Sequence, residues 1–177
     1  MLEAVSSYAT RAGEKLRRHG LETAHMAVFM HTSRFNERDP AHSGQTVVNF
    51  PEASADTLDL INAAQLGARR IFREGFRYAK AGIIMNDLVP AQSAPRPLFS
   101  ARDREKSARL MSALDAVNAR FGRSALTPAS NGLKRDWQAR FDRKSPRYTT
   151  RIDELPRVYA TMTLSRQCGC HADGLLD

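Results

Sequence analysis

A basic stretch near the C-terminal end of the chain carries the side chains with the most evident chemistry. Residues 134–151 read KRDWQARFDRKSPRYTTR, in which two acidic residues face seven cations: Lys134, Arg135, Arg140, Arg143, Lys144, Arg147 and Arg151. Trp137, Phe141 and Tyr148 lie between them. Cations neutralise phosphates and aromatic faces stack on bases, so the pattern is typical of nucleic-acid binding. A basic tail whose aromatic residues pack on their own protein fits the pattern equally well.

The sequence offers no self-contained active site. The histidines are His19, His25, His31, His42 and His171. No two of them stand at metal-ligand spacing with a carboxylate, and HExxH, GxSxG, a glycine-rich phosphate loop and a cluster of carboxylates are all missing. Cys168, Cys170 and His171 do not complete a structural metal site. We therefore predict no catalytic residue, no metal and no cofactor, and a chain that is not an enzyme by itself.

Composition favours a globular protein with an anionic partner. The chain has 177 residues, 42% of them hydrophobic, and 27 Lys and Arg against 19 Asp and Glu give a net charge of +8. Such a surplus favours nucleic acid first and an acidic membrane surface second. No run of about 18 apolar residues is long enough to span a membrane. With Cys168 and Cys170 as its two cysteines, the chain has no disulfide framework, and we expect a cytoplasmic protein that makes no membrane contact.

The charge is unevenly distributed along the chain. Residues 1–90 hold 11 Lys and Arg against 10 Asp and Glu, whereas residues 91–177 hold 16 against 9. Three prolines between residues 90 and 97 mark a change in composition. We interpret 1–90 as a folded domain, 91–100 as a linker, 101–160 as a basic extension and 161–177 as a tail of different character.

Hydrophobic periodicity predicts the order α-β-β-α-β for the first 90 residues. Helices are expected over 2–19 and from the capping residue Asp56 to about 73, and strands over 24–31, 45–50 and 78–86. The first two strands should form a hairpin with a long loop. At the centre of strand 24–31, Val28, Phe29 and Met30 are apolar in succession, which favours a strand covered on both faces.

This order is a β-α-β-β-α-β unit of the α+β class without its first strand. In a ferredoxin-like arrangement that strand would be central, so its absence would leave the middle of the sheet without main-chain partners. We therefore expect a 1–90 unit that is marginally stable or self-associates, because unpaired strand edges invite another chain.

The remainder of the chain predicts one helix and one peptide anchor. Residues 102–121 repeat apolar side chains at helical spacing, namely Leu110, Leu114, Val117 and Phe121, and this stripe needs a partner surface. In the linker, Leu98 and Phe99 follow Pro95 and Pro97. An apolar pair on a proline-stiffened segment suits a peptide that fills a pocket on a partner. The alternative is that the pair folds back on its own domain.

Several runs resemble the C-terminal part of Y-family translesion DNA polymerases, of the type of the catalytic subunit of bacterial DNA polymerase V. They are IFREGFRYAKAGI at 71–83 followed by DLVP at 87–90, YA at 8–9, EKLR at 14–17 and FMHT at 29–32. Downstream, RLM at 109–111, LD at 114–115, RFG at 120–122, SPRYTTR at 145–151 and DELP at 153–156 also fit. The resemblance covers about residues 1–160, and SPRYTTR with DELP is its most specific part.

The resemblance implies a role in SOS translesion synthesis and DNA repair. Residues 1–90 would be a little-finger domain, which grips the primer–template duplex through its sheet and mostly at phosphates. The catalytic palm of that family lies upstream and is missing, so the chain resembles a piece of a longer one. The family carries a clamp-binding peptide of the form Gln-x-x-Leu-Phe. Leu98 and Phe99 match its end, and Pro95 stands at the glutamine position.

The expected partners are therefore primer–template DNA, the sliding clamp and other subunits of polymerase V. The alternative from another class is an interaction or regulatory module that does not bind DNA. It would dock on the clamp or on polymerase partners through Leu98, Phe99 and the helix at 102–121.

Overall fold

The computed structural model describes residues 1–35, 39–97, 103–133, 137, 145–156 and 158. The chain divides into two units, Met1–Trp137 and Gln138–Asp177, which are described separately below. The ten positions 134–136 and 138–144 lie outside the described residues, as do the positions 98–102.

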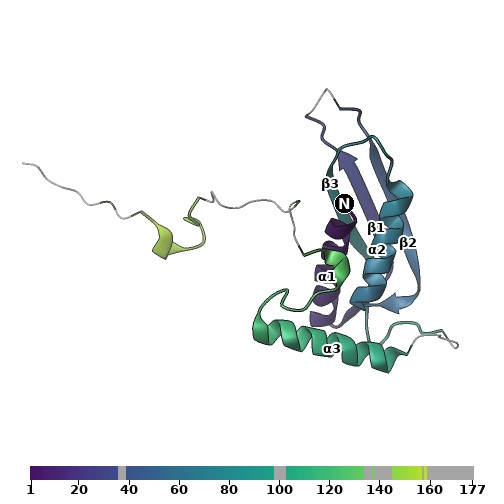
Figure 1. The fold of residues 1–177 in the computed structure, drawn as a ribbon. Helices are drawn as coiled ribbons and strands as arrows, with labels where there is room; N and C mark the ends of the chain where they lie inside the picture. Colours follow the sequence, from purple (N-terminus) through teal and green to yellow (C-terminus); the bar gives the residue numbers. More distant parts are fainter. Residues whose placement is uncertain (36–38, 98–102, 134–136, 138–144, 157, 159–177) are drawn as a thin grey trace, which may run out of the picture. The chain divides into compact units, whose positions relative to one another are not determined.

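A three-stranded antiparallel sheet forms the centre of the first unit (Figure 1). Its strands are β1 (Leu21–Thr32), β2 (Ser43–Ser54) and β3 (Tyr78–Pro90), and they lie in the order β2-β1-β3. Each strand contains the shorter segment that periodicity predicts. The long-looped hairpin of β1 and β2 is confirmed, since Met26 lies opposite Val48 and His31 opposite Ser43.

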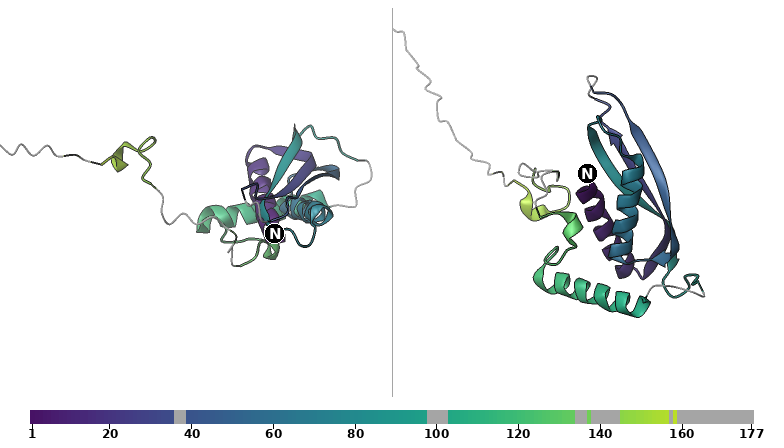
Figure 2. Two further views of the ribbon diagram at one scale, coloured as in Figure 1. Left: turned by 90° about the horizontal axis from the view of Figure 1, so that it is seen from above. Right: turned by 45° about the vertical axis from the view of Figure 1, so that its right-hand side comes forward.

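Two helices cover one face of this sheet: α1 (Leu2–Arg18) and α2 (Thr57–Ile71) (Figure 2). The Asp56 side chain accepts a hydrogen bond from the Leu58 N–H and caps α2, as the sequence predicts. Gly67 lets α2 approach the sheet closely, because a Cβ atom there would stand 2.7 Å from Cγ2 of Val28. The predicted α-β-β-α-β order and the α+β class are therefore confirmed, and the fold is compatible with a partial little-finger domain.

The core lies between the helices and the sheet, and alternate strand residues supply it. On the sheet side Met26, Val28 and Met30 of β1 are fully buried, beside Val48 of β2. Apolar side chains of α1 and α2 face them. Buried helix residues include Val5, Ala9 and Leu16 of α1 with Leu60, Ile61, Ala64, Ala68 and Ile71 of α2.

The sheet corrects the expectation that its middle lacks partners. The central strand is β1, which pairs with β2 on one side and with β3 on the other over most of its length. The two outer strands, not the centre, carry the edges. Self-association through those edges stays a prediction.

The expectation that β1 is covered on both faces was also wrong. Both helices lie on the side of Val28 and Met30, whereas Phe29 lies on the other side of the sheet and is half-buried. The apolar Phe29 is accommodated there because its ring rests on the neighbouring strand, where a Cβ at Gly82 would come within 2.4 Å of it.

The third helix, α3 (Arg104–Phe121), follows the linker and belongs to the first unit. Asp103 caps it by accepting a hydrogen bond from the Lys106 N–H, and Gly122 ends it with φ +99°. Of the predicted apolar stripe, Leu114 and Val117 are half-buried, whereas Leu110 is 50% and Phe121 69% exposed. The buried residue is Met111, at 3% exposure.

Short 3₁₀ turns occur at Ala129–Asn131 in the first unit and Ile152–Glu154 in the second. Within the described part of the chain, no helix has the length and apolar character needed to cross a membrane.

A candidate nucleic-acid interface on the open sheet face

The side of the sheet that faces away from α1 and α2 presents a grid of side chains, which we call the open face. Its four rows, read across β2, β1 and β3, are Asn49–His25–Asn86, Val47–Ala27–Ile84, Gln45–Phe29–Gly82 and Ser43–His31–Lys80. These residues alternate with the core residues along each strand, as the two-residue period of a strand requires. Amides, aromatic rings and a lysine thus share one surface.

Two aromatic rings lie at the middle of the open face. The rings of Phe29 and His31 are two residues apart on β1, with centroids separated by 6.0 Å and planes within 14° of each other. Phe29 rests over Gly82, whose missing side chain makes room for the ring. Both rings belong to the central strand, which is paired on both sides.

One end of the open face carries an acidic side chain, Asp87. His25 Nδ1 lies 2.9 Å from the Asn49 side-chain oxygen, and its Nε2 lies 3.4 Å from a carboxylate oxygen of Asp87. His25 is therefore occupied by neighbours on both outer strands. The carboxylate makes this end a poor place for a phosphate.

The other end opens into a hollow of about 590 Å³ at the start of the β1–β2 loop. Cations and histidines line it, namely His31, Arg34, His42 and Lys80. His42 is held in place, because its Nδ1 lies 3.0 Å from the hydroxyl of Tyr78 and its ring packs 4.9 Å from that of Phe76. Nearby, Arg77 is 3.9 Å from Asp39. Phe35, Ala41 and Ala79 line the hollow as well, and its cations Arg34 and Lys80 are groups that can contact a phosphate.

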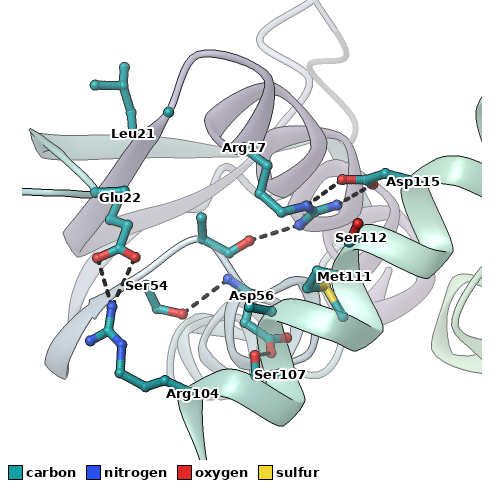
Figure 3. Close-up of a pocket in the computed structure, with 14 residues that line it drawn as sticks. Arg17, Leu21, Glu22, Ser54, Asp56, Arg104, Ser107, Met111, Ser112 and Asp115 are labelled. Carbon is teal, nitrogen blue, oxygen red and sulfur yellow. Dashed lines mark hydrogen bonds and ion pairs between the residues drawn. The ribbon is translucent and has the colours of Figure 1, made fainter.

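A second pocket, of about 410 Å³, lies beneath α3 (Figure 3). Its central group is Arg17 of α1, whose guanidinium donates two hydrogen bonds of 2.7 Å to the carboxylate of Asp115. The same guanidinium donates to the carbonyl of Ala55 at 2.8 Å and to the hydroxyl of Thr57 at 2.9 Å. The Arg17 side chain is 16% and that of Asp115 34% exposed, so this fork is partly shielded from water.

Further polar contacts fix the first half of α3 to the same pocket. Arg104 reaches Glu22 at 3.0 Å and Glu52 at 3.3 Å. The Ser107 hydroxyl donates to Asp56, the residue that caps α2. Between these groups Met111 is buried against the start of α2.

The charges of this pocket are satisfied within the protein. Arg17 and Arg104 pair with Asp115, Glu22 and Glu52. Little charge is left for an anionic ligand, so the arrangement fixes a helix and does not resemble a ligand site. These ion pairs attach α3 to α1 and to the sheet.

The segment after α3 returns along α1. The fully buried Asn131 exchanges hydrogen bonds with the Thr10 hydroxyl at 3.1–3.2 Å. The ring of Trp137 meets that of Tyr8 edge to face, with centroids 5.8 Å apart. The aromatic residue expected to bind DNA therefore contacts its own domain, although it remains 36% exposed.

The structure describes three of the side chains predicted to bind DNA. Besides Trp137, these are Arg147 and Arg151 of the second unit. The backbone N–H of Arg147 donates to the Glu154 carboxylate at 2.7 Å, and the Arg151 side chain lies 3.3 Å from both Asp153 and Glu154. Lys134, Arg135, Arg140, Arg143 and Lys144, and the predicted anchor residues Leu98 and Phe99, lie outside the described residues.

Sequence reasoning missed the contacts that hold α3. Arg17 looks like an ordinary cation in the last turn of a helix, and Asp115 like an exposed acid. No periodicity joins residues 98 positions apart, so no local signal identifies the pair. His25 and His31 share one face of β1. Within the described residues, no group of three or more His, Cys, Asp or Glu side chains is placed to hold a metal ion.

Two parts of the chain match known protein families. Residues 1–98 match the model of the impB/mucB/samB family C-terminal domain, and residues 108–158 match a domain of unknown function, DUF4113. The chain is 38% identical over 159 residues to protein UmuC of Salmonella typhimurium strain LT2, covering 89% of this chain and 38% of UmuC. It is 36% identical over 162 residues to protein SamB of Salmonella typhimurium, with 91% and 38% covered.

A third relative, protein MucB of Escherichia coli, is 36% identical over 156 residues, which is 88% of this chain and 37% of MucB. The chain thus spans little more than a third of the length of these relatives. The resemblance to the C-terminal part of UmuC-type Y-family polymerases is confirmed. With its family C-terminal domain model matched over residues 1–98, the chain belongs to the impB/mucB/samB family.

Proposed function

We propose that this chain supplies DNA binding and protein docking to an error-prone Y-family DNA polymerase that acts in SOS translesion synthesis and DNA repair. The observation that carries the proposal is the open face. A central strand with two parallel rings is flanked by amides and ends at a hollow lined by His31, Arg34, His42 and Lys80. The net charge of +8 supports an anionic partner.

DNA contacts of this kind would be made mainly to phosphate. The seven cations between residues 134 and 151 then add to those of the open face. Phosphate contacts release counterions, so the logarithm of the affinity should fall with the logarithm of salt concentration by about 0.9 per neutralised phosphate. Four contacts would give a slope of roughly −3.6 with little preference among duplex sequences.

The triple variant Arg143→Ala, Lys144→Ala and Arg147→Ala tests the share of the extension. Its salt slope for duplex binding should be flatter by roughly 2–3, and all duplexes should bind more weakly. A slope equal to that of the parent would show that these cations only face solvent, and the phosphate contacts would then be assigned to the β1–β2 hairpin.

Trp137→Ala tests base stacking. If the indole stacks on bases, the change should weaken the binding of single-stranded DNA by about 1–3 kcal/mol. If it does not, the change should lower the stability of the protein alone.

We further propose that the chain catalyses no nucleotide transfer by itself. Among the described residues no acidic cluster could hold the magnesium ions that such transfer uses. A magnesium-dependent primer-extension assay with the pure chain should give no product above the blank. Template-directed incorporation would overturn this part of the proposal.

A second candidate is a module that docks on protein partners such as the sliding clamp or other polymerase V subunits. The exposed apolar residues Leu110 and Phe121 of α3 favour it, as do Leu98 and Phe99 in the linker sequence. Duplex and clamp binding should be measured side by side, with Leu98→Ala and Phe99→Ala as controls. Clamp binding that these changes abolish, with no DNA affinity at any salt concentration, would favour the docking module over the DNA-binding one.

A further inference from the structure

We propose that Phe29 and His31 form a stacking platform for unpaired bases, so that the open face binds single-stranded DNA in addition to duplex phosphates. This inference rests on the proposed DNA-binding function and assigns it a particular strand form. It is carried by the placement of the two rings, by their neighbours across the sheet and by the distribution of charge around them.

The two rings are stacked on each other, and neither residue is fully buried. Their planes are within 14° of each other, and their centroids are 6.0 Å apart along the central strand. Both residues are half-buried, so each keeps part of its surface in water. Aromatic side chains on the exposed face of an antiparallel sheet stack on bases whose faces are free. In a duplex the base faces are stacked inside the helix, so the platform selects an unpaired strand.

The spacing indicates an extended strand. Helical strands advance by roughly 3.4 Å per nucleotide, which is well below the 6.0 Å between the rings. Two successive bases can reach the two rings when the strand is unstacked. Gln45 lies beside Phe29 across the sheet, and its exposed side-chain amide can donate to or accept from the edge of a base held there.

The cations Arg34 and Lys80 offer a binding place for the phosphates of a DNA single strand. Lys80 is the cross-strand partner of His31 and lines the hollow with Arg34 and His42. At the opposite end, the Asp87 carboxylate stands beside His25. A phosphate next to the base on His31 would therefore lie in the hollow, and the strand would leave the platform on the side of the β1–β2 loop.

The test uses the full chain and an oligothymidylate of roughly 12 nucleotides with one central 2-aminopurine, beside a duplex of equal length. Phe29→Leu keeps an apolar side chain over Gly82 and removes the aromatic face, whereas Phe29→Tyr keeps that face. The matched control is Leu66→Ala, an apolar loss on the exposed side of α2, 46% exposed and on the other side of the sheet. His31→Gln tests the second ring if Phe29→Leu does not fold.

We expect the parent to quench the 2-aminopurine fluorescence and Phe29→Leu to bind the single strand about 5- to 150-fold more weakly. Duplex binding rests mainly on phosphate contacts, so Phe29→Leu should weaken it much less than single-strand binding and leave both salt slopes unchanged. Leu66→Ala should match the parent, and Phe29→Tyr should keep single-strand binding close to that of the parent. A folded Phe29→Leu that binds the single strand like the parent, or loses both forms equally, would overturn the platform. A parent that binds duplex alone would overturn the platform and leave the proposed function standing. If the parent binds neither single-stranded nor duplex DNA, both the platform and the proposed DNA-binding function are overturned.

Discussion

The two helices behind the sheet and the helix at its end are attached by different forces. α1 and α2 bury an apolar stripe each, and Val5, Leu60 and Ile61 are almost fully removed from water. Met111 is the buried residue of α3, which is held otherwise by polar contacts of Arg17, Arg104 and Ser107. Burial of apolar area is non-directional and spread over many residues, whereas these polar contacts depend on a few atoms. Loss of one residue should therefore affect the two regions differently.

The largest expected effect lies in the apolar layer. Leu60 is fully buried between α1, α2 and the sheet, and Leu60→Ala removes methyl groups and leaves a cavity. The free energy of unfolding should fall by about 2–5 kcal/mol, measured by urea denaturation followed by circular dichroism. The exposed Leu66→Ala is the control. An equal loss in both variants would mean that the helix stripe does not form the core.

The next effect concerns the Arg17–Asp115 fork. Arg17→Met keeps the apolar stem and leaves the Asp115 carboxylate, the Ala55 carbonyl and the Thr57 hydroxyl without their donor. We expect a loss of about 1–3 kcal/mol, less than for a fully buried pair because Asp115 is partly exposed. Amide hydrogen exchange should quicken in α3 before it does in α2, because α3 can open locally.

A double-mutant cycle with Asp115→Asn isolates the pair. The two single changes and the double change should show an interaction energy of about 1 kcal/mol or more. Additive effects would mean that the Arg17–Asp115 pair does not hold α3. The attachment of α3 would then differ from that of α1 and α2 only in the apolar area buried.

These two regions also separate what the sequence can and cannot predict. α1, α2 and all three strands follow from local periodicity, because each repeats its signal several times within one element. The Asp56 cap follows from its residue type at the start of a helix. The position of β1 at the centre of the sheet and the Arg17–Asp115 contact are non-local. Nothing near Arg17 in the sequence distinguishes it from Arg18, which pairs with Glu14 on the surface of the same helix.

The open face shows the same limit. Alternation places Phe29 and His31 on one side of β1, but the apolar run Val28–Phe29–Met30 does not say which side the helices cover. Gly82, which supports the Phe29 ring, is on a strand 53 positions later in the chain and carries no signal of its own. Pairing register decides the site, and register depends on the whole sheet.

A smaller effect is expected where α3 meets the first domain through an apolar contact. Met111→Gln places an amide in a site that is 3% exposed, against the start of α2. Burial of an amide without a full set of partners costs about 1–3 kcal/mol, and relaxation at the edge of the pocket should keep the loss near the lower value. Faster amide hydrogen exchange in α3 should report this loss of stability, as for Arg17→Met. Protection equal to that of the parent would place Met111 outside the contact.

The smallest effect is expected at the neighbouring position. Leu110 belongs to the stripe that periodicity predicts as the contact face of α3, yet it is 50% exposed while Met111 beside it is 3% exposed. Leu110→Gln introduces a residue of similar helix propensity and similar size, so stability and α3 exchange should change by no more than about 0.5 kcal/mol. If Leu110→Gln instead releases α3 while Met111→Gln does not, the apolar stripe is the contact face after all. The fork of Arg17 would then be a surface ion pair of little consequence, and α3 would be attached in the same way as α1 and α2.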